Sequence, residues 1–324
     1  MANFPFRLFS INNDASSVAP LSASTQSTAI AQRMAYVERL IIELRKPDLR
    51  ENALHVLSKR TELFQDLAPL LWNSFGTIAI LLQEIISIFP NIPLQNLTLA
   101  QSTRVCNVLA LLQCVASHPD TKMLFLNANM PLYLYPFLQT TNQLPQFEHL
   151  RLASLGVIGA LVKVSTKEVI TYLLSSEIIP LCLSNMEIGK EVSRTVATFI
   201  IQRILGDGDG LAYICAAADR FFAVRQVLDM MLKNLEKRPS PRLFKLVISC
   251  YSRLSDNHSR AAIALASYLP NMLTNATFNN YFREDPTTWR LVEHLYENIG
   301  MNQDPLAPGE GEINDVVGTS LFGK

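Results

Sequence analysis

The sequence repeats a pattern of apolar helical segments, and this repeat limits the folds open to the chain more than any other feature. Residues 107–138 and 156–183 each run from a long apolar helix, through a break at a serine, to a shorter helix and then to an apolar helix with an early proline. These prolines, Pro131 and Pro180, lie 49 residues apart. Residues 195–232 and 243–273 continue the pattern with changed loops, and an earlier unit ends in 67–85. Helical units of this length predict a solenoid of stacked repeats.

The rest of the chain favours helix and lacks the signals of strands. We find no alternation of polar and apolar residues with β-branched enrichment between turns, and twelve glycines are few for 324 residues. Helix starts are marked by Pro47-Asp48, by Pro119-Asp120 and by Ser165-Thr166-Lys167-Glu168. The predicted fold is therefore all-α: an armadillo-like right-handed superhelix of about six three-helix repeats.

The two ends of the chain differ in composition from this helical region. Residues 1–26 are rich in Ser, Ala, Thr and Asn, which predicts a disordered tail. The run QDPLAPGEGE breaks helix soon after residue 300. We therefore expect an armadillo-repeat domain at 27–300, followed by a flexible C-terminal tail at 301–324.

The helix predicted at 150–165 is apolar around most of its circumference, whereas an ordinary surface helix has one apolar stripe. A central helix of a solenoid is covered by its own unit and by both neighbours, so this pattern fits the repeat. One face of this helix carries small residues between His149 and Lys163, namely Ala153, Gly156 and Ala160. Close helix packing and the floor of a ligand groove both explain such a face.

Net charge gives no direct indication of a partner. Lys plus Arg equals Asp plus Glu, with 28 of each, which favours neither nucleic acid nor an acidic partner. Basic residues nevertheless recur on the long helices, at Arg104, Arg151, Lys163, Arg194 and Arg203. They could line one trough and attract phosphate, although no aromatic residues for base stacking are interleaved with them.

No pattern of residues indicates catalysis or a metal centre. The five histidines form no metal-ligand pair, and nucleophile-elbow and phosphate-loop motifs are missing. The five cysteines lie in apolar helical stretches without a CxxC pair, which predicts buried, reduced thiols. The run GDGDG at 206–210 starts like a calcium loop, but Leu211 and Ala218 stand where ligands are needed, so we expect a flexible inter-helix turn. We expect no cofactor, no secretory signal and no membrane span.

Several segments resemble one protein family, in order, over about residues 28–300. They are RENALHVLSKR, DLAPLLWNSFGTIAILLQEI, RVCNVLALLQCVASHPDTK, LRLASLGVIGALVK, EIIPLCL, TVATFIIQRIL, GLAYIC and RLSDN. The chain resembles the Rcd-one/Caf-forty family ("required for cell differentiation"), whose members are the armadillo-repeat subunit of the CCR–NOT mRNA deadenylase complex. The resemblance implies a non-enzymatic subunit that docks on the large NOT scaffold.

The resemblance also implies two interaction surfaces at particular residues. The scaffold-docking surface includes Asn73, Phe75 and Ala79, with Asn73 in place of a histidine that is common in the family. The concave groove takes short, often helical peptides of RNA-binding regulators at positions matching His149, Gly156 and Val196. Together with the small-residue face and its basic neighbours, the predicted peptide groove comprises His149, Arg151, Ala153, Gly156, Ala160, Lys163 and Val196.

A third implied surface is a tryptophan pocket on the convex side, which animal members use to hold silencing proteins. The matching residues are Arg220, Arg242 and Arg260. Ala218 stands where a tyrosine is common, so we expect this pocket to lack an aromatic wall and to bind weakly.

The leading hypothesis is an adaptor that recruits RNA-bound regulators, so that separate nucleases shorten poly(A) tails in the cytoplasm, including P-bodies, and in the nucleus. The first alternative is an armadillo protein that binds nucleic acid directly in a basic groove. The second is an import- or catenin-like peptide receptor, but the two tryptophans, Trp72 and Trp289, form no ladder of the kind those proteins use. The sequence leaves open whether the chain forms a homodimer.

Overall fold

A computed structural model describes residues 23–61, 66–257, 261–266, 269, 273, 278, 281–283 and 285–300. Over these residues the chain is helical, without a strand. Helix α1 begins at Ala23, so it starts inside the segment that the sequence predicts as a tail. The remaining parts of both predicted tails, 1–22 and 301–324, and Arg260 lie outside the described residues.

The helices follow one another as repeated units, which confirms the predicted all-α armadillo-like architecture. The first units are α1 (Ala23–Leu44), α2 (Pro47–Ser58), α3 (Leu67–Asn73), α4 (Thr77–Ser87) and η2 (Phe89–Asn91). The middle units are α5 (Leu99–Ser117), α6 (Pro119–Asn127), η3 (Met130–Leu134), α7 (Tyr135–Gln139), α8 (Pro145–Lys163), α9 (Lys167–Ser175) and α10 (Ile178–Ile188). The last are α11 (Glu191–Gly206), α12 (Gly208–Ala216), α13 (Ala218–Lys237), α14 (Pro241–Ser255), α15 (Ala261–Ala266) and α18 (Pro286–Asn298).

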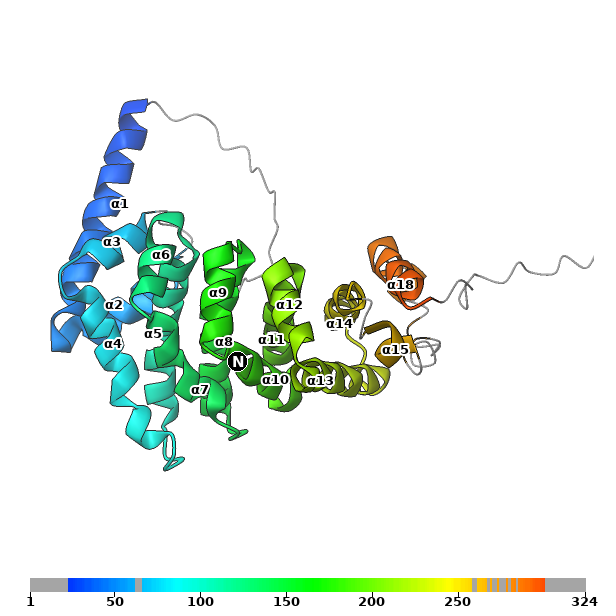
Figure 1. Cartoon of the computed structure of the whole chain (residues 1–324). Coiled ribbons are helices and arrows are strands. Elements are labelled where there is room, and N and C mark those ends of the chain that lie inside the picture. Colours follow the sequence, from blue (N-terminus) through cyan, green and yellow to red (C-terminus); the bar gives the residue numbers. More distant parts are fainter. Residues whose placement is uncertain are drawn as a thin grey trace, which may run out of the picture.

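The long helices form a continuous stack through the molecule (Figure 1). Helix α2 packs against α5, α5 against α8, α8 against α11, α11 against α14, and α14 against α18. The shorter helices α9 and α12 contact each other in a second row, and in a third row α10 contacts both α7 and α13. The three predicted helix starts are confirmed, since α2 begins at Pro47, α6 at Pro119 and α9 at Lys167.

Helix α8 explains why the sequence at 150–165 is apolar on so many sides. It lies between α5 and α11 and also packs against α7. Its buried residues include Leu150, Leu155, Val157, Ile158 and Leu161, which point in different directions around the helix. Burying each such side chain contributes about 1.5–3 kcal/mol, so contacts between units supply much of the stability of the solenoid.

Polar contacts also join successive units, and some of them repeat. The Arg203 Nε group in α11 donates a hydrogen bond to the carbonyl oxygen of Val162 at the end of α8, at 3.1 Å. One unit later, the Arg253 Nε group in α14 donates to the carbonyl oxygen of Leu205 at the end of α11, at 3.2 Å. The last carbonyls of a helix lack intrahelical partners and carry partial negative charge. Each arginine therefore caps the preceding long helix.

A buried ion pair fastens the start of α8 to the start of α11. Glu148 is 4% exposed and Arg151 is fully buried. The Arg151 guanidinium donates to the Glu148 carboxylate at 2.5 Å, and to the carbonyl oxygens of Thr140 and Asn142. The same carboxylate accepts hydrogen bonds from the Ser193 hydroxyl at 2.7 Å and from the Lys190 backbone N–H at 2.9 Å.

These contacts shift the acidity of Glu148. Burial alone would raise the pKa of this carboxyl, but the hydrogen bonds from Ser193, Arg151 and Lys190, with the Arg151 charge, outweigh burial and hold the pKa below its ordinary value. The charged form is therefore the one that the folded protein favours.

The GDGDG run is a tight helix junction and not a flexible turn, so that expectation is wrong. Asp207 alone separates α11 from α12. Its carboxylate caps α12 by accepting hydrogen bonds from the backbone N–H groups of Asp209 at 2.9 Å and Gly210 at 3.2 Å. Gly210 packs so closely on α11 that an added Cβ atom would lie 2.0 Å from the carbonyl oxygen of Ile204.

Helix α5 is long and apolar enough, by length and composition, to cross a membrane, and two bent helix pairs pass the same test. In the structure, α5 packs between α2 and α8, which cover its apolar residues. Its apolar composition is thus explained by its central position in the stack.

We predict opposite behaviour for two glycines of the α11–α12 junction. Gly210→Ala should lower the free energy of unfolding by about 1–3 kcal/mol, because backbone must move to admit the new methyl group. Gly208→Ala is the matched control, since no atom lies within 4 Å of its added Cβ atom; it should leave stability unchanged or raise it by up to about 1 kcal/mol. Urea unfolding followed by circular dichroism measures both, and equal effects would contradict the packing described for Gly210.

We predict that Glu148→Gln destabilises the protein by about 3 kcal/mol at pH 7, because it leaves the buried Arg151 without a counter-charge. The folded-state pKa of Glu148 is depressed, so its stabilising contribution is present above the unfolded pKa of about 4.3 and is lost as pH falls through the folded pKa. The difference between wild type and variant should therefore shrink in acid. Urea unfolding at a series of pH values measures it.

Glu187→Gln is the control for this prediction, because Glu187 is exposed on α10. It should be nearly neutral at every pH. A Glu148→Gln variant whose deficit stays constant down to acid pH would show that the ionised carboxylate has no special role.

Candidate functional site

The three residues predicted to dock the scaffold lie together on an exposed corner between α3 and α4. The two helices meet at about 88°. Gly76 makes this turn possible, because its φ of +76° is a left-handed conformation that a side chain disfavours. Asn73 and Ala79 are exposed on either side of the turn, and Phe75 is 86% exposed at its tip.

Phe75 is the most exposed large hydrophobic side chain among the described residues. Its only described ring contact is with the Arg45 guanidinium of α1, 5.9 Å from the ring centroid. Covering an aromatic ring that is exposed to water lowers the free energy, so such a ring favours contact with a partner. The structure thus brings the predicted docking residues to one accessible, apolar place.

The predicted peptide-groove residues are mostly below the surface. Lys163 is exposed and His149 is half-buried. The other five, Arg151, Ala153, Gly156, Ala160 and Val196, are buried, and Val196 is only 1% exposed. The sequence left two explanations for the small residues of α8, and their burial favours close helix packing.

His149 lies at the edge of this buried face, close to the junction before α11. Burial lowers the pKa of His149, and the positive charge of Lys190 lowers it further, while Glu148 acts in the opposite direction. The histidine is therefore biased towards its neutral form.

Most arginines of the basic trough considered from the sequence have partners inside the protein. Arg104 binds Glu84, with Nε 2.6 Å from the carboxylate, and Arg50 binds the same carboxylate. Arg151 and Arg203 are held by Glu148 and by the carbonyl oxygen of Val162, as described above. Cations neutralised or held in this way attract phosphate weakly.

The candidate tryptophan-pocket residues are divided between two helices. Arg220 lies in α13, with its guanidinium 3.8 Å from the ring centroid of Tyr213. Arg242 lies in α14 with much of its side chain exposed, and the part that is covered lowers its pKa. Arg260 lies outside the described residues. Tyr213 already covers the Arg220 guanidinium. We expected no aromatic wall here because Ala218 stands where a tyrosine is common, but Tyr213 supplies an aromatic ring from α12.

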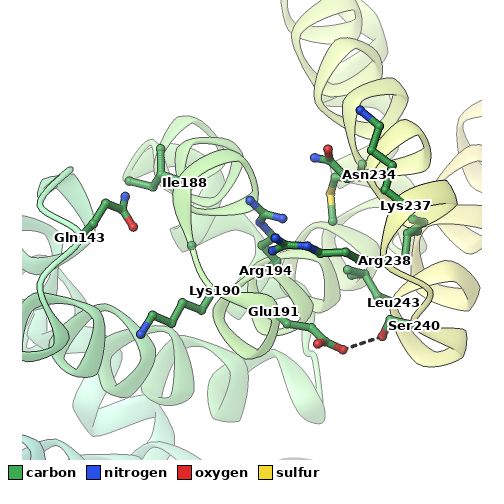
Figure 2. A pocket seen from close by; sticks show the side chains of 13 residues that line it. Gln143, Ile188, Lys190, Glu191, Arg194, Asn234, Lys237, Arg238, Ser240 and Leu243 are labelled. Carbon is green, nitrogen blue, oxygen red and sulfur yellow. Dashed lines mark hydrogen bonds between the residues drawn. The ribbon is translucent and has the colours of Figure 1, made fainter.

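One well-formed pocket was not predicted from the sequence. It has a volume of about 650 Å³ and lies where the α10–α11 junction faces the α13–α14 junction (Figure 2). Residues lining it are Gln143, Ile188, Gly189, Lys190, Glu191, Arg194, Met231, Asn234, Leu235, Lys237, Arg238, Ser240 and Leu243. Only Arg194 was singled out in the sequence. Lys190 lies at the start of the same helix, whereas Lys237 and Arg238 come from the end of α13 and are brought close by stacking.

Metal-binding clusters and reactive thiols are the two kinds of chemical site that the described residues allow us to assess. No group of three or more His, Cys, Asp or Glu side chains among them could hold a metal ion. Four cysteines are buried and Cys114 is partly buried. Burial raises the pKa of the Cys114 thiol to about 11 and that of Cys106 to about 12, which leaves both thiols protonated and unreactive at neutral pH.

Solved structures with a similar fold are designed armadillo repeat proteins. One, in complex with the peptide (KR)4, aligns with a TM-score of 0.57 over 81% of this chain and 99% of its own, at 14% sequence identity. Another designed armadillo repeat protein aligns with a TM-score of 0.58 at 12% identity, with the same coverage. At this identity the similarity concerns the fold alone.

Curated relatives are much closer in sequence. The "Cell differentiation protein rcd1" of Schizosaccharomyces pombe is 51% identical over 265 residues, which cover 82% of this chain and 93% of that protein. "Protein CAF40" of Saccharomyces cerevisiae is 51% identical over 247 residues, covering 76% of this chain and 66% of the relative. Residues 40–299 match the family described as "Cell differentiation family, Rcd1-like". The chain therefore belongs to the Rcd1-like cell differentiation family.

Proposed function

We propose that this protein is a non-catalytic adaptor of the CCR–NOT mRNA deadenylase complex. In this role it docks on the NOT scaffold and recruits RNA-binding regulators through peptide contacts, for mRNA decay and translational repression in the cytoplasm, including P-bodies, and in the nucleus. Family membership supports the proposal, as does a solenoid fold, which offers extended surfaces to other proteins.

The exposed α3–α4 corner is the observation on which the docking proposal depends. Phe75 projects from it at 86% exposure, and Asn73 and Ala79 are exposed beside it. Interfaces gain most of their affinity from a few central residues, and buried aromatic anchors are prominent among them. Phe75 fits that role, with Asn73 as a polar neighbour and Ala79 leaving room for close approach.

Peptide recruitment must use residues around the small-residue face, because that face is itself buried. Val192 lies one turn before Val196 on the same side of α11 and is 55% exposed. His149 is half-buried and Lys163 is exposed at the two ends of the α8 face. An apolar partner helix would rest on these accessible residues, with the close-packed helices beneath as a rigid support.

Direct nucleic-acid binding is less favoured as the main function. Arg104, Arg151 and Arg203 are engaged within the fold, so these three arginines do not form a line of free cations along the described long helices. Counterion release at such a line is the main source of affinity for a phosphate backbone.

We predict that Phe75→Ala weakens scaffold binding by about 2 kcal/mol or more, which is about thirtyfold in Kd. Its stability should change by less than about 0.5 kcal/mol, because the ring is exposed. Phe222→Ala is the matched control, since Phe222 is 49% exposed on α13 and should bind the scaffold normally. Calorimetry with the purified scaffold segment measures both, and normal affinity of Phe75→Ala would refute this docking surface.

We predict that Val192→Glu removes RNA-binding regulators from the complexes purified from cells, while the scaffold is retained. The new carboxylate would have to lose water against an apolar peptide. Val196→Glu is a poor test, because a charge at this buried position would unfold the protein. Leu124→Glu, at a residue 43% exposed on α6, is the control. Quantitative mass spectrometry that finds the regulators equally retained in both variants would exclude α11 as a peptide surface.

A further inference from the structure

The pocket between the α10–α11 and α13–α14 junctions has a strong excess of positive charge. Four cations line it, Lys190, Arg194, Lys237 and Arg238, against one carboxylate, Glu191. That carboxylate accepts a hydrogen bond from the Ser240 hydroxyl at 2.8 Å, as the dashed line in Figure 2 shows. Arg194 and Arg238 both extend into the middle of the pocket in this view (Figure 2).

These four cations differ from the other basic residues on the long helices. Arg50, Arg104 and Arg151 form ion pairs with glutamates. By contrast, none of the four pocket cations forms an ion pair within the described parts of the chain.

Arg194 offers a donor without a described acceptor. Its guanidinium donates through Nη2 to the carbonyl oxygen of Glu187 at 3.0 Å. Its Nε group is buried and has no hydrogen-bond partner among the described residues. Buried donors are normally satisfied, so the Arg194 guanidinium keeps unused hydrogen-bonding capacity beside the pocket.

The shape and lining of the pocket favour a peptide over RNA. Its apolar residues are aliphatic, namely Ile188, Met231, Leu235 and Leu243, and Gln143 and Asn234 add amides. None of its described lining residues is aromatic, whereas single-stranded nucleic acid is usually held by stacking of bases on aromatic rings. Aliphatic side chains next to carboxylates are the natural complement of aliphatic walls next to cations.

We propose that this pocket binds an acidic peptide segment of a partner protein, in which Asp or Glu residues alternate with aliphatic ones. The ligand carboxylates pair with Arg194 and Arg238, and with the lysines at the rim. Its aliphatic side chains rest on Ile188, the accessible aliphatic residue of the lining. This inference does not depend on docking to the NOT scaffold, because the α3–α4 corner lies in a different part of the solenoid (Figure 1).

Fluorescence anisotropy with the full chain and a labelled Glu-Leu-Glu-Glu-Leu-Glu peptide tests the proposal. A peptide with Gln in place of each Glu is the control probe and should bind at least about tenfold more weakly. Lys237→Gln combined with Arg238→Gln should weaken the acidic peptide by about tenfold, since two charge-assisted contacts are lost. Both side chains are exposed, so this double variant should keep its fold, as circular dichroism will check.

Arg194→Gln is the second variant and should also weaken binding, whereas Lys59→Gln, at an exposed lysine after α2 outside the pocket, should bind like wild type. Equal binding of the two peptides, or an equal loss in Lys59→Gln, would overturn the proposal. So would tighter binding of a labelled oligoadenylate that is lost in the same pocket variants, which would make RNA the ligand. The proposal would also be overturned if the acidic peptide bound only after residues 301–324 were removed. That result would indicate that the acidic C-terminal segment of the chain itself occupies the pocket.

Discussion

The packing of each long helix against the long helices of both neighbouring units is the interaction on which the rest of the structure depends. Helices α5, α8 and α11 are each enclosed in this way, and none could bury its apolar surface within its own unit. Cations at helix ends and the Glu148–Arg151 pair then fix the register between units. The partner surfaces follow from this stack, because corners and junctions between helices are the places that stacking leaves accessible.

The balance of charge within the stack separates structural cations from available ones. The net charge of the chain is zero, but its cations fall into two groups. Buried arginines such as Arg151 are paired with a carboxylate or bound to carbonyl groups. The cations of the pocket lie close together and form no ion pair among the described residues; they are Lys190, Arg194, Lys237 and Arg238. A desolvated charge requires a partner in the folded protein, whereas an exposed charge is solvated by water and remains available to bind a ligand. The same type of residue therefore stabilises the fold in one place and offers a binding site in another.

Periodicity alone was enough to predict the fold, because a recurring apolar pattern specifies which surfaces must be covered. It also predicted that the helix at 150–165 would be enclosed. It could not decide whether Ala153 and Gly156 faced a ligand or another helix, because small residues suit both, and burial favours the second. The exposure of Phe75 was implied only by the family resemblance, since a phenylalanine in an apolar segment normally predicts core. The pocket escaped prediction because Arg194 and Arg238 come from successive units, and their proximity depends on the geometry of the superhelix.

The positions of the two candidate surfaces make their roles separable. The Phe75 corner belongs to α3 and α4, and the cationic pocket belongs to α10, α11, α13 and α14, with α5 and α8 between them (Figure 1). In a solenoid each unit contacts mainly its neighbours, so a substitution at one end has little effect on packing at the other. The free-energy effects of distant substitutions are usually additive. A protein built in this way can engage one partner at the α3–α4 corner and a second at the cationic pocket without either contact disturbing the other.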